Sequence, residues 1–139
     1  MGNLIIDQKE RVCDWVSARL DRCSVPFVGY YAMGVERNGE LVAGIVMDNY
    51  NAQNAYPHIV IEKTGKDVIH LITAFCDYAF NHCQLKRLTA MIPASKPDVL
   101  AFDLKLGFEY EFLMKDGAKD GDLHIIKMTP QSCRWLRGS

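Results

Sequence analysis

The sequence has little of what marks several large classes of protein. Its 139 residues include 16 Lys or Arg and 17 Asp or Glu, a net charge of -1, with no basic block. The electrostatic surface that binds nucleic-acid phosphates is therefore not predicted. No apolar run approaches the roughly 20 residues that cross a bilayer, and the first residues do not have the pattern of a signal peptide. These features predict a cytoplasmic protein without a nucleic-acid or membrane partner.

Metal-site and disulfide patterns are also missing. The five cysteines include no C-x-x-C pair, and the four histidines show none of the spacings that zinc sites use. We interpret the cysteines as free thiols of a reducing compartment, and we predict no metal. Cys76 and Cys83 lie seven residues apart, which predicts one shared helix face. The sequence indicates no third partner that would give them a redox or metal role.

The composition that is present is that of an ordinary globular protein, 49% hydrophobic and 24% charged. The length is sufficient for one packed core without metal or disulfide staples. Because no repeat, low-complexity tract or Pro/Gly-rich linker divides the chain, residues 1–139 are predicted to form a single domain.

Local patterns predict the elements along the chain. Asn38-Gly39 supplies the two positive-φ residues of a type I′ turn between two alternating runs, which predicts a β-hairpin. Further on, apolar residues alternate like a strand, yet Ser95 as N-cap, Pro97 in the first turn and Gly107 as a stop favour a helix. The predicted helices are 8–22, 66–83 and the one ended by Gly107; the predicted strands are 28–36, 41–48, 57–62, 86–92, 108–114 and 123–128, with one more left open at 4–6.

The strand at 57–62 runs through Thr64-Gly65-Lys66 directly into the long helix. A helix N-terminus carries free N–H groups and about half a positive charge, so this junction predicts an anion, typically a phosphate. The order of elements is α–β–β–β–α–β–α–β–β. It predicts a mixed α/β sheet: three antiparallel strands, a crossover helix, a parallel strand, a second helix and a final hairpin, with helices on both faces.

One string is more specific than these patterns, Leu104-Lys105-Leu106-Gly107-Phe108 at the end of the last predicted helix. Further strings are Gly34-Val35, Val42-Ala43-Gly44, Asp48-Asn49-Tyr50, Leu85-Lys86-Arg87-Leu88-Thr89-Ala90, Asp122-Leu123-His124-Ile125-Ile126-Lys127-Met128 and Cys133-Arg134-Trp135-Leu136. Together they cover nearly the whole chain. They resemble the GNAT superfamily of N-acetyltransferases, most closely its short phage- or prophage-type members.

The resemblance implies transfer of an acetyl group from acetyl-CoA to an amine of a protein or small molecule. It implies that strand 57–62 splays from its parallel neighbour 86–92 and offers its backbone edge to the pantetheine arm. The N–H groups of residues 65–69 would then hold the pyrophosphate. The residues assigned to acetyl-CoA in this way are Ile59, Val60, Ile61, Lys63, Gly65, Lys66, Asp67, Val68, Ile69, Lys96 and Phe102.

Three positions depart from the superfamily's pattern and keep a second hypothesis open. The phosphate loop has one glycine, Gly65, followed by Asp67, which we interpret as a solvent-facing residue at the helix start. Lys96 stands where many members have asparagine, and Asp103 replaces a tyrosine that often serves as general acid. The alternative function is therefore a catalytically degenerate protein of this fold that acts as a binding partner or inhibitor.

Acetyl transfer to an amine requires a base for the amine and a proton donor for the departing thiolate. Glu62, at the end of the slot strand, is the first candidate base, although an edge-strand glutamate that faces water explains it equally well. His58, with an ordinary pKa of about 6.5, is either a second candidate or a surface histidine. Asp103 needs burial and a raised pKa to act as an acid. Tyr31 and Tyr110 are alternative donors or amphipathic residues of the sheet.

Three further expectations concern surfaces. Phe102 and Phe108 are predicted to pack, with Phe102 lining the slot. The polar loop 49–54 either lines the acceptor site or serves only as a connection. Dimers are common among the proteins that this chain resembles, and the apolar C-terminal strands with Trp135 predict a surface for a second copy. A phage origin would make a host protein the acceptor.

Overall fold

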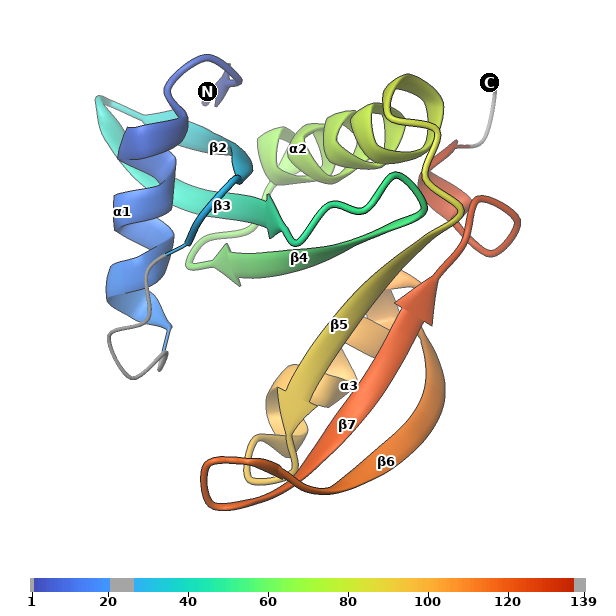
Figure 1. Ribbon diagram of the computed structural model, residues 1–139. Coiled ribbons are helices and arrows are strands. Elements are labelled where there is room, and N and C mark those ends of the chain that lie inside the picture. Colours follow the sequence, from blue (N-terminus) through green and yellow to red (C-terminus); the bar gives the residue numbers. More distant parts are fainter. Residues whose placement is uncertain (1, 21–26, 137–139) are drawn as a thin grey trace.

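The computed structural model describes residues 2–20 and 27–136. They form a seven-stranded mixed sheet in the order β1-β2-β3-β4-β5-β7-β6, with helices on both of its faces (Figure 1). The predicted mixed α/β class is therefore confirmed. The last two residues of the first predicted helix, and Cys23, lie outside the described residues.

The bounds of the elements agree with most of the predicted ones. The strands are β1 (Asn3–Ile5), β2 (Tyr31–Arg37), β3 (Glu40–Asp48), β4 (Asn54–Ile61), β5 (Arg87–Pro93), β6 (Glu109–Ala118) and β7 (Gly121–Met128). The helices are α1 (Lys9–Arg19), α2 (Lys66–Asp77) and α3 (Pro97–Leu106), with a π-helical turn η1 (Tyr78–His82) and a 3-10 turn η2 (Arg134–Leu136). Within the described part of the chain, no helix is long and apolar enough to cross a membrane.

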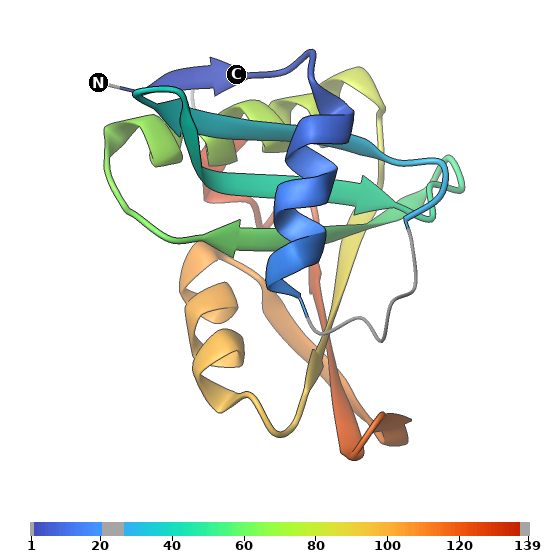
Figure 2. The same cartoon turned by 90° about the vertical axis from the view of Figure 1, so that its left-hand side faces the viewer.

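The sheet separates two apolar clusters. On one face, α1 packs on β2 and β3 through Val12 and Val16, both fully buried. On the other face, the amphipathic spacing of α2 places Leu71 and Phe75 in a larger cluster with the C-terminal strands. Figure 2 shows α1 in front of strands β2, β3 and β4 and α2 behind them. Leu106 of α3 packs in the same cluster as α2. Strand β3 is buried on both faces as a result, apart from its first residue.

The turn chemistry explains which boundaries the sequence predicted well. Asn38 and Gly39 have φ of 53° and 83°, so the predicted type I′ hairpin is confirmed. Gly107 ends α3 with φ of 117°, as predicted. The predicted cap at Ser95 is wrong, because the N-cap of α3 is Lys96 and its side chain makes no capping hydrogen bond. The C-terminal hairpin is also longer than predicted, since β6 extends to Ala118.

The second helix ends differently from its prediction. Regular α-helix stops at Asp77, and a π-helical turn follows it from Tyr78 to His82. Tyr78 in this turn stacks on Tyr31, with ring centroids 4.3 Å apart. Cys83 therefore lies beside Tyr78, whereas Cys76 faces Cys133. The helix face that Cys76 and Cys83 were predicted to share is not formed.

Candidate active site

The parallel strands β4 and β5 diverge along their length. They pair at only two positions, Asn54 with Arg87 and Ala55 with Leu88, although β4 continues to Ile61 and β5 to Pro93. We call the diverging halves of these strands the β4–β5 fork (Figure 1). Beyond Ala55, the backbone edge of β4 has no strand partner on this side. The predicted splay of the two strands is confirmed.

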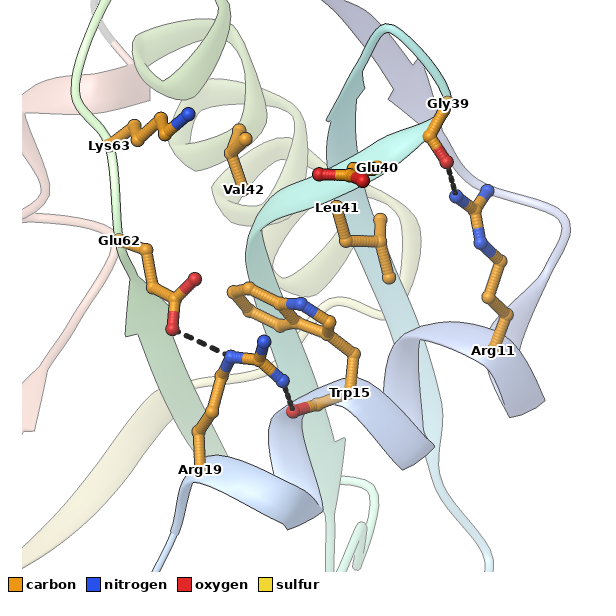
Figure 3. Close-up of a pocket in the computed structure, with 9 residues that line it drawn as sticks. All are labelled: Arg11, Trp15, Arg19, Gly39, Glu40, Leu41, Val42, Glu62 and Lys63. Carbon is orange, nitrogen blue, oxygen red and sulfur yellow. Dashed lines mark hydrogen bonds and ion pairs between the residues drawn. The ribbon is translucent and has the colours of Figure 1, made fainter.

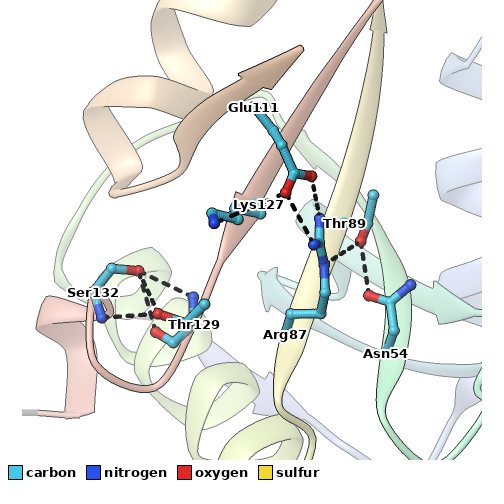
Figure 4. Close-up of polar contacts among 7 residues, drawn as sticks. All are labelled: Asn54, Arg87, Thr89, Glu111, Lys127, Thr129 and Ser132. Carbon is cyan, nitrogen blue, oxygen red and sulfur yellow. Dashed lines mark hydrogen bonds and ion pairs between the residues drawn. The ribbon is translucent and has the colours of Figure 1, made fainter.

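A polar network joins the strands where the fork begins (Figure 4). The buried Thr89 hydroxyl donates to Oδ1 of Asn54 across the two strands at 2.7 Å. Arg87 Nε donates to Thr89 Oγ1 at 3.0 Å, and its Nη2 pairs with Glu111 of β6 at 2.6 Å. Lys127 of β7 lies 3.8 Å from the same carboxylate. The network therefore fixes β4 to β5 at one end of the fork, and the other end diverges. Of the polar loop 49–54, Asn51 accepts hydrogen bonds from the backbone N–H groups of the two residues that follow Ala52.

The N-terminus of α2 lies at the end of β4, as predicted. Gly65 is its N-cap, and Val68 and Ile69 already donate their N–H groups to the Gly65 carbonyl at 3.1 and 3.2 Å. Among the described residues, no acceptor is found for the N–H groups of Gly65 and Lys66. The predicted anion site of residues 65–69 therefore includes too many residues, because the N–H groups of Val68 and Ile69 are already hydrogen-bonded within the helix.

Asp67 corrects the sequence interpretation most clearly. It is 8% exposed and does not face solvent. Arg37, at the end of β2, donates two hydrogen bonds to this carboxylate, from Nε to Oδ2 and from Nη2 to Oδ1, both at 2.7 Å. Its Nη2 also donates to the Thr64 carbonyl at 2.8 Å. Asp67 Oδ1 in turn accepts from the Val68 N–H. The Arg37 guanidinium lowers the pKa of Asp67 to about 2, so the helix start carries a compensated charge.

This ion pair also fixes the glycine in the loop. Gly65 has φ of +151°, and a Cβ there would lie 2.7 Å from Arg37 Nη2 and 3.0 Å from Asp67 Oδ1. A larger side chain at this position would therefore break the pair. The single glycine of the loop is needed for the approach of Arg37 as well as for its backbone conformation.

Asp103 lies in α3, on the β5 side of the fork. Its side chain is 8% exposed, and burial alone raises its pKa from 3.8 to about 7. Both properties that an acid role requires are therefore present. The alternative donors are engaged elsewhere: the Tyr31 hydroxyl donates to the Ile6 carbonyl at 3.1 Å, and the Tyr110 hydroxyl lies 2.9 Å from His124 Nδ1.

His58 is paired with a carboxylate from the neighbouring strand. Its Nε2 lies 2.8 Å from Oδ1 of Asp48 at the end of β3, and Asp48 is buried. The imidazole also contacts the Phe27 ring, with centroids 4.8 Å apart. A carboxylate on one ring nitrogen fixes the tautomer and leaves the other nitrogen to exchange protons. His58 is therefore not a simple surface histidine.

Glu62 is held on the α1 side of β4 (Figure 3). Its Oε2 accepts from Arg19 Nε at 2.7 Å, and Arg19 stacks on the Trp15 ring, 4.0 Å from its centroid. These side chains line a pocket of about 410 Å³, together with Arg11, Gly39, Glu40, Leu41, Val42 and Lys63. Glu62, the first candidate base of the sequence argument, is therefore engaged by Arg19 in an exposed ion pair.

The remaining residues predicted to bind acetyl-CoA lie on both faces of β4 and on the surface of other elements. Ile59 and Ile61 pack against the cluster under α2, and Val60 packs against the cluster under α1. Lys63, Lys66 and Lys96 are exposed. Phe102 is 40% exposed, so the prediction that it packs into the protein is wrong, whereas Phe108 is buried as predicted. No group of three metal-binding side chains occurs among residues 2–20 and 27–136.

Comparison with solved structures identifies the architecture. The chain superposes on a point mutant of spermidine N-acetyltransferase SpeG from Vibrio cholerae with a TM-score of 0.74 at 16% identity, over 97% of this chain and 98% of that one. A second SpeG mutant gives 0.74 at 15% identity, with coverages of 98% and 96%. The fold is therefore that of the GNAT acetyltransferases.

A further solved structure, described as "Probable acetyltransferase", matches with a TM-score of 0.66 at 16% identity, over 94% of this chain and 93% of that one. By sequence, the chain matches no protein-family model and no curated protein. At these identities the structural matches establish the fold, and the activity must be argued from the site.

Three functional features were missed by the sequence argument. They are Arg37 as the partner of Asp67, Asp48 as the partner of His58, and the Asn54–Thr89 clip at the start of the fork. Each joins residues of different elements that only the folded structure brings together. The one available signal was the Asn38-Gly39 turn, because it fixes the hairpin that carries Arg37.

Proposed function

We propose that this protein is an N-acetyltransferase that transfers an acetyl group from acetyl-CoA to an amine. The observation that carries the proposal is the β4–β5 fork, which leaves one backbone edge of β4 unpaired beside a helix N-terminus. The amide groups of a pantetheine arm match such an edge, and a pyrophosphate matches the Gly65 and Lys66 N–H groups. The exposed Lys63 and Lys66 add positive charge beside them. Because Arg37 compensates the charge of Asp67, this carboxylate does not exclude a phosphate at the helix N-terminus.

For the base we propose His58 in place of Glu62. Asp48 orients the His58 ring, whereas Glu62 is engaged by Arg19. In this mechanism the second ring nitrogen of His58 takes a proton from the acceptor's ammonium group, directly or through water, and the neutral amine then attacks the thioester. Glu62 then serves to position Arg19 over Trp15. Steady-state kinetics of His58→Ala and Glu62→Gln separate the two roles, because only the first change should lower kcat strongly.

For the acid we propose Asp103. With a pKa of about 7 its carboxyl is about half protonated at neutral pH, so it can give its proton to the departing thiolate. Burial favours the protonated form of this carboxyl, whereas a tyrosine hydroxyl is protonated at neutral pH because its ordinary pKa is high. The replacement of tyrosine by aspartate in α3 is therefore compatible with activity.

The acceptor is an amine of a small molecule or a protein. Spermidine appears in the name of the SpeG neighbours and is the first compound to test, beside a peptide with a free N-terminus. The four cysteines that the structure describes are free, which supports a reducing compartment and a cytoplasmic site of action.

We also propose a homodimer through the free edge of β6. Its exposed residues Phe112, Leu113 and Met114 are between 41% and 47% exposed. An antiparallel pairing of two β6 strands centred on Phe112 would place Glu109 opposite Lys115 of the second copy, so the charges match at both ends. Trp135 was predicted to join this surface, but its indole N–H donates to the Leu106 carbonyl of its own chain at 2.7 Å. Phe112→Lys should give a monomer by sedimentation.

Acetyl-CoA binding tests the proposal. Calorimetry and thermal shift should detect one site, and a ligand at a hundred times its dissociation constant adds about 2.7 kcal/mol of stability. Lys66→Glu places a negative charge beside the phosphates and should weaken binding. Lys119→Glu, at an equally exposed position in the β6–β7 turn, is the matched control. Gly65→Glu is unsuitable because it would break the Arg37–Asp67 pair.

A binding protein without activity is the second candidate function, favoured by the single glycine of the loop. It predicts no thermal shift with millimolar acetyl-CoA and no hydrolysis of the thioester. That result would exclude the enzyme and direct the work to a protein partner.

A further inference from the structure

The pocket beside α1, here called the α1 pocket, lies outside the β4–β5 fork. Its walls are one face of α1, the turn between β2 and β3 with the start of β3, and the end of β4 (Figure 3). Its volume of about 410 Å³ is within the range of small-molecule sites, roughly 300 to 1,000 Å³. Of the residues assigned above to acetyl-CoA, only Lys63 lines it. The pocket therefore has room for a small ligand of its own.

The helical wall of the α1 pocket is held in place by the protein itself. Arg11 donates through Nη1 to Glu36 Oε1 at 2.7 Å and through Nη2 to the Gly39 carbonyl at 3.0 Å. At the other end of the helix, Arg19 Nε donates to Glu62 Oε2 at 2.7 Å. These contacts attach α1 both to the hairpin turn and to the end of β4. The pocket is therefore preformed, which lowers the entropic cost of binding a ligand.

The charged groups that remain available in the α1 pocket are of both signs. Among the described residues, Glu40 and Lys63 have no ion-pair partner, and both are exposed. Figure 3 shows Glu40 on the β3 wall and Lys63 on the β4 wall. The ion pair of Arg19 with Glu62 uses Nε and Oε2, so it leaves Nη2 and Oε1 as a further donor and acceptor. Such a set of groups matches a ligand that carries both an ammonium and a carboxylate group.

The lining between these charges is apolar. It consists of Trp15, Leu41 and Val42. The Arg19 guanidinium covers one face of the indole, 4.0 Å from the ring centroid, and the indole also lies against Gly44, where a Cβ would be 3.5 Å from its Cε3. Because Arg19 occupies the face on which an aromatic ligand would stack, this lining is better suited to an aliphatic side chain.

We propose that the α1 pocket binds a free aliphatic amino acid. The ammonium group of the ligand pairs with the Glu40 carboxylate, its carboxylate pairs with the Lys63 ammonium group, and its side chain lies on the apolar lining. Bound in this way, the ligand connects the hairpin turn to the end of β4. The proposal does not depend on the proposed acetyltransferase function, because neither the Gly65 and Lys66 amides nor Asp103 lines the pocket.

The test uses L-leucine as the probe and the two tryptophans of the chain, Trp15 and Trp135, as reporters. In nitrogen–proton correlation spectra of the full-length protein without acetyl-CoA, millimolar leucine should shift the indole N–H signal of Trp15. The indole N–H of Trp135 donates to the Leu106 carbonyl, away from the pocket, so its signal should stay in place. The variant Trp135→Phe assigns the two signals. No shift of the Trp15 signal would overturn the proposal.

Two analogues test the charges of the ligand separately. Leucinamide keeps the ammonium group, and N-acetylleucine keeps the carboxylate. Each should bind about fivefold or more weakly than leucine, because each loses one charge-assisted contact. An affinity equal to that of leucine for either analogue would overturn the proposal, and so would an equal shift of the Trp15 signal by inorganic phosphate, which would indicate a simple anion site.

Protein variants test the assignment of each charge to its partner. Glu40→Gln should weaken the binding of leucine and leave that of N-acetylleucine unchanged, whereas Lys63→Gln should weaken leucine and leave leucinamide unchanged. Glu10→Gln, at an exposed position of α1 that does not line the pocket, is the matched control. Leucine could instead bind as an acceptor amine at His58. Loss of binding in His58→Ala with full binding in Glu40→Gln would show this and overturn the proposal.

Discussion

Each side of the β4–β5 fork carries one aspartate of low exposure. The two aspartates differ in their partners and in the direction in which their pKa is shifted. Asp67 begins α2, Asp103 lies in α3, and both are 8% exposed. Asp67 has Arg37 and a helix N–H group as partners, and its pKa falls to about 2. Asp103 forms no ion pair within the described residues, and burial raises its pKa to about 7. At the same exposed fraction, Arg37 therefore keeps Asp67 an anion, whereas burial favours the protonated form of Asp103.

The difference shows how a fold assigns roles to identical side chains. Desolvation disfavours the charged form of both carboxylates, but an opposite charge at hydrogen-bond distance outweighs desolvation at Asp67. When two acids in one site titrate far apart, the higher one is available for proton transfer at neutral pH. The comparison therefore supports the proposed acid role of Asp103 and indicates a structural role for Asp67.

The largest expected effect is the loss of turnover in Asp103→Asn. An amide cannot donate a proton to the thiolate, and a positioned acid contributes about 10²-fold or more. Steady-state kinetics with acetyl-CoA and the acceptor should show a lower kcat and a nearly unchanged KM. Asp67→Asn, at the equally buried position, is the control, and an equal loss of kcat there would contradict the assignment.

The same variant should be more stable than the parent protein at high pH. The folded-state pKa of Asp103 lies above its ordinary 3.8, so its cost is absent below pH 3.8, grows as the pH rises to 7, and is constant above. Each tenfold change in proton affinity corresponds to about 1.4 kcal/mol. Because the amide is also polar and buried, we expect a gain of about 2 kcal/mol at pH 8. Urea unfolding at pH 4 and pH 8 measures it, and equal gains at both pH values would refute the pKa.

Removal of Arg37 should change stability in the opposite sense. Arg37→Met leaves the Asp67 carboxylate without its cation, and the unfolding midpoint at pH 7 should fall. We expect this effect to be smaller, because the Arg37 side chain is 28% exposed and the helix N–H still holds the carboxylate.

The pH dependence identifies the cause of this loss. Asp67 has a lowered pKa, so the pair contributes its full stability above pH 3.8, and this contribution is lost as the pH falls towards 2. The difference between Arg37→Met and the parent should shrink over the same range in thermal unfolding. The double variant Arg37→Met with Asp67→Asn should recover part of the loss at pH 7; no recovery would show that Arg37 acts through packing alone.

The smallest effect is expected at the exposed ion pair of Arg19 and Glu62. Their side chains are 34% and 49% exposed, and exposed pairs contribute about 0.5 kcal/mol. Arg19→Met should therefore leave the unfolding midpoint nearly unchanged in urea. A large loss would mean that the contact of Arg19 with Trp15, rather than charge, holds α1 in place.

The sequence was informative wherever a few neighbouring residues determine the structure. Asn38-Gly39 specified a hairpin turn and Gly107 a helix end because each supplies a positive φ. The order of elements was then enough for the class of the sheet, whereas the splay of β4 from β5 was implied by the family resemblance. Glycine chemistry and strand order are local properties, so one sequence was sufficient to predict them.

The paired charges of the site could not be predicted in the same way. Arg37 and Asp67 lie thirty residues apart, and His58 meets Asp48 only through the register of β3 with β4. A solvent-facing Asp67 was the reasonable expectation for a helix start, since carboxylates favour that position with or without a partner. The π-helical turn was also invisible, because a hydrophobic period of 3.6 continues through it.

The hydrogen bond between Asn54 and Thr89 connects β4 to β5 at one end of the fork, so a small rotation there moves the far end of β4. At about 3.3 Å per residue, the strand extends roughly 20 Å from Ala55 to Ile61. A rotation of a few degrees at the Asn54–Thr89 hydrogen bond would therefore displace the far end by roughly one to two ångströms. Thr89→Val would loosen the pivot while leaving the helices in place. Loss of this buried hydroxyl at the closed end of the fork is therefore expected to change the separation of β4 and β5 at its open end.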